Sequence, residues 1–210
     1  LMNKGATERE LLAVDSEFTD CVNVDSWRYS QIRCLAANPN HPASKFGTGN
    51  KVTLGNEQTR EELLKFHRKY YKASRMSLCI LGNASLDELS AMVVDKFSTI
   101  DCGQNTKDAN GLDYPIVKAY GKEQMSKFYY IVPKKETRVL KLVFQFPQQI
   151  DTFRKKSECY LSHLIGHEGP GSICQALQSK GWSTELECGE VLTTSEFSLF
   201  GVDISLSPSG

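Results

Sequence analysis

Two glutamates near the start of the chain, Glu10 and Glu17, have the side-chain type and the spacing that most directly suggest chemistry. Seven residues make about two helical turns, so on a helix the second carboxylate lies about 20° around from the first. The residues between them, from Leu11 to Val14, are apolar, and an unpaired carboxylate is costly beside apolar surface. We therefore expect a cationic group to meet this face; the alternative is two solvated glutamates on a surface helix.

A second candidate set lies near the end of the chain. His163 and His167 are four residues apart on a predicted helix and Glu168 follows them, a spacing that could hold zinc. The turn at 169–171 has the sequence Gly-Pro-Gly, which would also suit the close approach of another backbone, because glycine has no side chain in the way. The residues alone leave both interpretations open.

Two further interpretations are set aside. A glycosidase that uses Glu10 and Glu17 as its acid pair is excluded by geometry, because positions two turns apart on one helix face are about 10 Å apart at the backbone. His41 lies between Asn40 and Pro42 in a loop with no ligand partner in range, so it is expected to be structural or solvated.

Local signals predict the elements of the first part of the chain. Apolar periodicity and capping residues predict four helices. They lie at 7–22, at 24–37 with Asp25 as N-cap, at 57–73, and from the capping box formed by Ser85 and Glu88 through Phe97. A short apolar run predicts a strand at Met76–Leu81. Prolines, glycines and asparagines make 38–50 a loop. The polar stretch at 101–115 is typical of a linker, which predicts a domain boundary near residue 115.

The second part combines strands and helices. We predict strands at Phe128–Val132 and Val139–Phe146, paired through the turn at 133–137, then helices at 154–166 and 172–181 with Ser172 as N-cap, then strands at 184–193 and 196–206. Strands followed by helices and again by strands predict an α+β fold with an antiparallel sheet.

Composition excludes several classes of partner. The 210 residues carry 25 basic and 25 acidic side chains, so no electrostatic footprint for nucleic acid or an anionic membrane is expected. No apolar run approaches the roughly 20 residues needed to span a bilayer. The seven cysteines include no Cys-x-x-Cys pair, which favours free thiols in a reducing compartment, and we expect the cytoplasm.

Several stretches together resemble the pitrilysin family of inverted-motif zinc metallopeptidases. They are ERELLAVDSE, NPNHPASKFGTGNK, ELLKFHRKYY, HLIGHEGPGS and LQSKGW, in that order. The resemblance implies Zn²⁺ as cofactor in the parent protein, with Glu17 as the third zinc ligand and Glu10 as a catalytic-site acid that orients or polarises the surroundings of the metal. The His-x-x-Glu-His helix that supplies the other ligands is absent, so we expect an internal fragment that is inactive alone.

The resemblance also implies an arrangement of domains and a substrate-binding exosite. Residues 1–115 correspond to the C-terminal part of the first, zinc-binding peptidase domain, and 116–210 to the N-terminal part of the second; each repeated domain is a curved antiparallel sheet with helices on one face. The implied exosite residues, which anchor a peptide by strand addition, are His163, Gly166, His167, Gly169, Leu186, Glu187, Cys188 and Gly189. The family has a glycine pair where this chain has Cys188-Gly189, so peptide anchoring could differ here.

Two functions stay open at this point. The first is part of a zinc metalloendopeptidase whose partners are peptide substrates and the remaining domains of the same polypeptide, with a homodimer of the parent as a further option. The second is a non-catalytic paralogue that serves as a peptide-binding or scaffolding subunit. The residues just before Leu1 would discriminate them, because an intact His-x-x-Glu-His motif means a protease.

Overall fold

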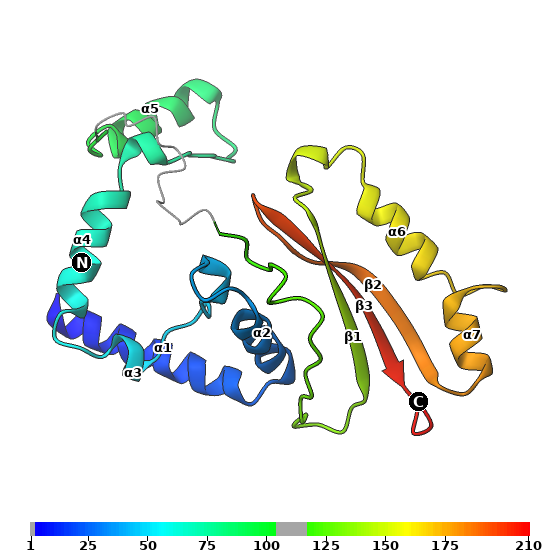
Figure 1. Ribbon diagram of the computed structural model, residues 1–210. Helices are drawn as coiled ribbons and strands as arrows, with labels where there is room; N and C mark the ends of the chain where they lie inside the picture. The colour runs from blue at the N-terminus through cyan, green and yellow to red at the C-terminus, as the bar shows by residue number, and fades with distance from the viewer. Residues whose placement is uncertain (1–2, 104–116) are drawn as a thin grey trace. The chain divides into compact units, whose positions relative to one another are not determined.

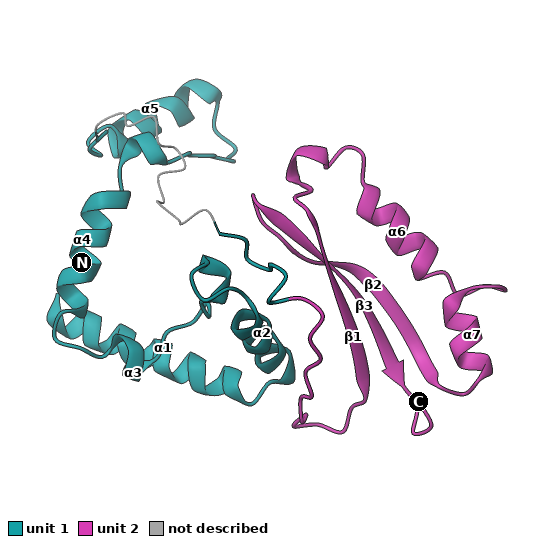
Figure 2. Cartoon of the chain, in the orientation of Figure 1, with its two compact units in different colours: residues 1–124 teal, residues 125–210 magenta. Residues whose placement is uncertain are grey.

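The computed structural model of the chain describes residues 3–103 and 117–210 (Figure 1). The chain divides into two compact units, residues 1–124 and residues 125–210 (Figure 2). Most of the predicted linker falls on residues 104–116, which lie outside the described residues. The predicted boundary near residue 115 therefore stays a prediction.

The described part of unit 1 is built from helices. They are α1 (Lys4–Val22), α2 (Asp25–Ala36), α3 (Lys51–Leu54), α4 (Thr59–Tyr70) and α5 (Leu86–Phe97), with short 3-10 turns at Pro42–Ser44 and Ala73–Arg75. The four long helices confirm the predicted ones to within a few residues at each end. None of the described helices is long and apolar enough to cross a membrane.

The helix starts show which capping predictions hold. The Ser85–Glu88 capping box is confirmed, because the Ser85 backbone N–H donates to the Glu88 carboxylate at 2.8 Å and the Glu88 N–H donates to the Ser85 hydroxyl. Asp25 is the first residue of α2 and not its N-cap, which is Val24. The Asp25 carboxylate pairs instead with Arg28, one turn along the helix, at 2.8 Å.

An aromatic side chain, Phe46, anchors the loop between α2 and α3. Its ring meets Phe18 of α1 and Trp27 of α2 edge-on, with ring centroids 6.4 Å and 5.8 Å away. His41 of the same loop is buried, and its Nδ1 accepts a hydrogen bond from the Ala43 N–H at 3.0 Å. His41 therefore has the structural role expected of it.

The predicted strand at residues 76–81 is not formed. The sheet of the described residues contains other segments only, and Met76 and Leu78 have exposed fractions of 44% and 51%. A strand requires a neighbour for its backbone hydrogen bonds. The sequence pattern predicts the local preference but does not supply that neighbour.

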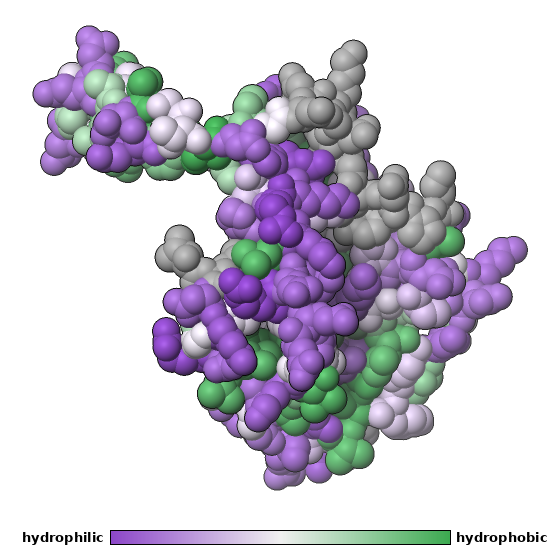
Figure 3. Space-filling view, turned by 90° about the vertical axis from the view of Figure 1, so that its left-hand side faces the viewer, coloured by the Kyte–Doolittle hydropathy of each residue, from purple (hydrophilic) through white to green (hydrophobic). Residues whose placement is uncertain are grey.

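Unit 1 buries very little of its apolar surface. Among its described residues only Ala37, His41 and Ala119 are buried. Large apolar side chains on its helices remain exposed, including Leu12, Leu35, Phe66, Leu86 and Phe97. Figure 3 shows such apolar side chains at the surface beside hydrophilic ones. Apolar surface of this kind marks places where another layer of protein packs.

Unit 2 is an antiparallel sheet with two helices on one face, which confirms the predicted α+β class. Its strands are β1 (Val139–Pro147), β2 (Ser183–Thr193) and β3 (Phe197–Leu206), and its helices are α6 (Ser157–Ile165) and α7 (Ile173–Ser179), preceded by a 3-10 turn at Ile150–Thr152. The strand order is β1-β3-β2, with both pairings antiparallel. Both helices contact β2 (Figure 2).

The core of unit 2 lies between the sheet and the two helices. It is formed by Cys174 of α7, Leu186 of β2, and Phe200 and Val202 of β3. The Ser172 hydroxyl accepts from the Gln175 N–H at 3.1 Å, so the predicted N-cap of α7 is confirmed. This cap fixes the first turn of α7, where Cys174 packs into the core.

The predicted pairing of 128–132 with the next strand is wrong. Residues 128–132 form no strand, and β1 pairs with β3, so that Leu142 lies opposite Val202. The short apolar run next to a turn favoured a hairpin, but β3 pairs with β1 along the whole of β1, and residues 197–202 of β3 are buried.

We expect Phe200→Ala to lower the free energy of unfolding of unit 2 by about 3–5 kcal/mol, because it removes a buried ring from the core. Phe200 is 3% exposed and its ring stacks on Phe146 at 5.6 Å. Urea unfolding followed by circular dichroism measures the change. The matched control is Tyr160→Ala, at a ring that is 70% exposed; equal effects of the two substitutions would contradict this description of the core.

Candidate functional site

Glu10 and Glu17 lie along one side of α1, and both are exposed. The helix starts at Asn3, whose side chain accepts from the Ala6 N–H at 2.8 Å. Asp15 accepts from the Lys51 N–H at 2.8 Å and so ties α1 to the start of α3. Asp15 is two residues from Glu17, or about 200° around the helix, so Glu17 points away from this contact.

The expected cation beside these carboxylates is not found among the described residues. Neither Glu10 nor Glu17 forms an ion pair there, and because both are exposed there is no desolvation cost for a cation to offset. The described residues also contain no group of three or more His, Cys, Asp or Glu side chains that could hold a metal. A protein zinc site needs at least three such ligands, so these residues do not form one by themselves.

The second candidate set lies where α6 ends. The helix ends at Ile165 with Gly166 as its C-cap, so His167 lies beyond it, and the expectation of two histidines one turn apart on a helix is wrong. Their rings are 6.3 Å apart at the centroids and both side chains are exposed. A Cβ on Gly169 would lie 2.7 Å from Nε2 of His167, so glycine allows the imidazole to fold over the turn.

The strand segment 186–189 of β2 divides its side chains between two faces. Leu186 is 4% exposed and belongs to the core, so only its backbone can take part in binding. Glu187 points to the other face and is exposed, as the period of two requires. Leu186 through Gly189 pair regularly with Ile204 through Gly201, between the two irregular points of the β2 ladder.

The outer edge of β2 has no strand beside it among the described residues. The central strand is β3, and β1 lies on its other side, so β2 is an edge of the sheet described here. An edge strand presents unpaired backbone donors and acceptors that can pair with an extended peptide. The segment that resembles an exosite thus lies on an element whose geometry suits strand addition.

Ser162 is a residue of this region that sequence analysis missed. Its hydroxyl donates to the backbone carbonyl of Cys188 at 3.0 Å, and the Cys188 thiol donates to the Ser162 carbonyl at 3.2 Å. The only signal for Ser162 in the sequence was its place directly before His163, because its partner lies 26 residues away. The Cys188 side chain is thus turned toward α6.

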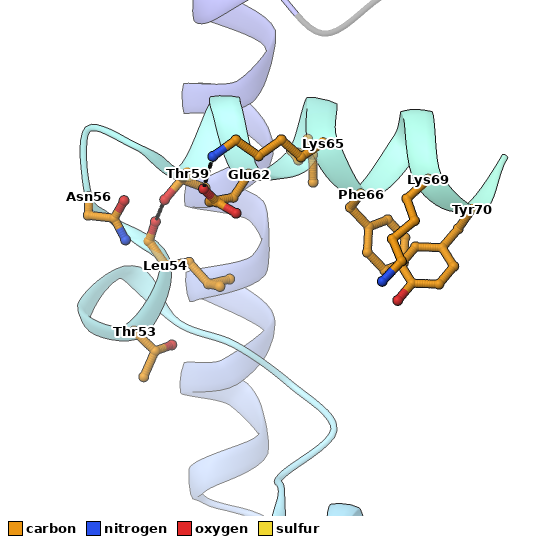
Figure 4. Close-up of a pocket in the computed structure, with 10 residues that line it drawn as sticks. Thr53, Leu54, Asn56, Thr59, Glu62, Lys65, Phe66, Lys69 and Tyr70 are labelled. Carbon is orange, nitrogen blue, oxygen red and sulfur yellow. Dashed lines mark hydrogen bonds and ion pairs between the residues drawn. The ribbon is translucent and has the colours of Figure 1, made fainter. Parts of the chain in front are cut away.

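A separate hollow of about 550 Å³ in unit 1 holds none of the predicted site residues (Figure 4). It lies between α3 and α4, with the rings of Phe66 and Tyr70 4.6 Å apart and Lys69 over Tyr70. Its charged pair, Lys65 and Glu62, is bonded at 2.7 Å. The side of α4 that lines the hollow thus carries both apolar and charged side chains, and none of the residues predicted to act in chemistry.

Comparison with known proteins identifies the family. A profile described as "Peptidase M16 inactive domain" matches residues 58–209. The chain belongs to the M16 peptidase family. This confirms the expected family. The structure of the chain is also similar to the crystal structure of pitrilysin, with a TM-score of 0.88 and 28% sequence identity. The match covers 100% of this chain and 22% of the pitrilysin chain.

Two curated relatives of this M16 chain are named as proteases. "Insulin-degrading enzyme" of Drosophila melanogaster is 39% identical over 216 residues, which covers 100% of this chain and 21% of the relative. A Caenorhabditis elegans protein whose name includes "zinc protease" is 37% identical over 216 residues, 99% of this chain and 24% of the relative. The M16 chain thus spans between a fifth and a quarter of the length of these relatives. Its family match contains the whole α6–β2 region and leaves Glu10 and Glu17 outside.

We expect the Cys188 thiol of this M16 chain to be alkylated several times more slowly than that of Cys159. Burial raises the pKa of Cys188 and outweighs the lowering effect of its hydrogen bonds to Ser162 and Gly166, so less thiolate, the reactive form, is present at a given pH. Cys159 lies on α6 and is exposed. Timed iodoacetamide labelling with peptide mass spectrometry measures both rates, and equal rates would contradict the half-buried position of Cys188.

Proposed function

We propose that this chain is part of a longer zinc metalloendopeptidase and that its α6–β2 region anchors peptide substrates by strand addition. The observation that carries the proposal is the match to the M16 family over residues 58–209, together with the open edge of β2 inside that range. Relatives named as proteases support the peptidase activity of the longer protein.

The geometry of the anchoring region suits a binder of many sequences. Backbone pairing along β2 gives affinity with little dependence on side chains. Around the peptide end, His163 and His167 offer two exposed imidazoles, which can donate or accept hydrogen bonds. Glu187 adds an exposed carboxylate on the strand itself, so a free amino terminus would find an acidic partner there.

The proposed zinc role of this chain is confined to α1. Glu17 would supply one ligand and Glu10 would orient the surroundings of the metal. Zinc, when bound, activates a water for attack on the peptide carbonyl. The remaining ligands must come from outside the described residues, because these residues form no cluster of three. What α1 supplies is a capped helix of 19 residues on which both carboxylates are exposed.

A second candidate function is peptide binding without catalysis. The matched family description, "Peptidase M16 inactive domain", favours such a role for residues 58–209. The two candidates agree on the function of the α6–β2 region and differ on whether α1 takes part in a working zinc site.

In the longer polypeptide, we expect Glu17→Gln to remove most of the zinc, because a neutral amide is a weaker ligand than a carboxylate. Glu10→Gln should keep most of the zinc and lower peptide hydrolysis by about 10- to 100-fold, as for a group that orients a ligand. Elemental analysis and a fluorogenic peptide assay measure the two effects.

The matched control is Glu8→Gln, an exposed carboxylate on the same helix but on another side. It should change neither zinc content nor hydrolysis. Normal zinc and turnover in both the Glu10 and Glu17 variants would overturn their assignment, and a longer polypeptide with neither zinc nor hydrolysis would favour the non-catalytic binder.

A further inference from the structure

The last turn of α6 and the middle of β2 are joined by two hydrogen bonds between the same two residues. Ser162 donates its hydroxyl to the Cys188 carbonyl, and Cys188 donates its thiol to the Ser162 carbonyl, at 3.0 Å and 3.2 Å. The Ser162 carbonyl also accepts the last helical bond of α6, from the Gly166 N–H at 2.8 Å. This reciprocal contact, the Ser162–Cys188 clasp, therefore includes the end of the helix itself.

Glycines on both elements make the clasp possible. A Cβ on Gly166 would lie 2.8 Å from the Ser162 carbonyl oxygen and 3.3 Å from Sγ of Cys188. A Cβ on Gly189 would lie 3.4 Å from the Ser162 hydroxyl. The first distance lies within the helix end itself and is too short for a real side chain, so Gly166 is required where α6 ends. Between helix and strand, the 3.3 Å distance to Sγ of Cys188 is a tight contact for a side chain and the 3.4 Å distance is an ordinary one.

The clasp lies between the two segments that the proposed function assigns to peptide anchoring. Ser162 directly precedes His163, and Cys188 lies between Glu187 and Gly189. We infer that Ser162 and Cys188 are positioning residues, whose clasp fixes the spacing between the histidines at the end of α6 and the peptide-pairing edge of β2. This inference rests on the proposed anchoring function.

The clasp also gives the Cys188 thiol a role in this chain. Its side chain points into the contact between helix and strand, on the same face as the core residue Leu186. The thiol therefore stabilises β2 from the face that packs on α6, and the backbone edge of β2 stays open to a peptide. Loss of either donor removes one of the two bonds and loosens the spacing between the helix end and the strand, while Ile165 still packs against the core of unit 2.

The test measures the Kd of an extended peptide with a free amino terminus and a C-terminal fluorophore. Fluorescence anisotropy is recorded on the full-length polypeptide with a chelator present, so that the peptide is not cleaved. Ser162→Ala and Cys188→Ala should each raise Kd by about three- to tenfold, the effect of a lost hydrogen bond. The double variant should raise Kd further than either single variant, because each single substitution leaves the other side-chain-to-carbonyl bond in place.

Rescue and controls make the result specific. Cys188→Ser retains a donor and should keep Kd within about twofold of wild type, and it serves as the folded variant if an alanine variant fails to fold. Cys159→Ala, on the same helix, should leave Kd unchanged. A Kd increase in Cys188→Ser as large as in Cys188→Ala would overturn the clasp as a positioning device.

A further arm separates this inference from the proposed function. The double variant His163→Ala/His167→Ala tests anchoring itself. If that variant weakens binding and Ser162→Ala does not, the clasp inference is wrong and anchoring stands. If neither weakens binding, peptide anchoring at this region is wrong as well.

Discussion

Unit 2 depends on the pairing of β3 with strands on both sides. The segment Phe197–Val202 is buried throughout, and β1 and β2 each form an antiparallel ladder with this strand. Its core side chains meet α7 and the partly buried Ile165 of α6 on one face. Because β3 is central, β2 is an edge of the sheet that the described residues form, and this edge is the one that we propose to bind peptides.

Unit 1 has helices without an equivalent central layer. Its well-formed caps and the aromatic contacts of Phe46 account for local order, yet only three of its described residues are buried. Helices whose apolar sides remain exposed gain most of their stability from packing against other elements. The exposed apolar sides agree with our proposal that the chain is part of a longer polypeptide, and Glu10 and Glu17 are exposed on α1.

Sequence analysis succeeded where the signal was local. The capping box at Ser85, the N-cap at Ser172 and the existence of strand β1 each depend on residues within a few positions, whereas Leu142 and Phe144, expected on one apolar face of β1, are exposed. It failed where the outcome depended on distant partners, as for residues 76–81 and for the bonds of Ser162 to Cys188. The predicted end of the helix at residue 166 is confirmed to within one residue, and only the expectation that His167 lies on this helix is wrong, because Gly166 is its C-cap. The family resemblance indicated the peptide-anchoring region, because the spacing of His163 and His167 alone could not decide between a zinc site and a contact with another backbone.

The most direct test of the central claim is amide hydrogen exchange along the sheet of the full-length polypeptide, with and without an extended peptide. Exchange should slow at Glu187–Gly189 on β2 when the peptide binds, because new backbone hydrogen bonds form at that edge. Exchange along β1, on the other side of β3, should not change. Equal exchange at β2 with and without saturating peptide, or protection at β1 alone, would contradict strand addition at this site.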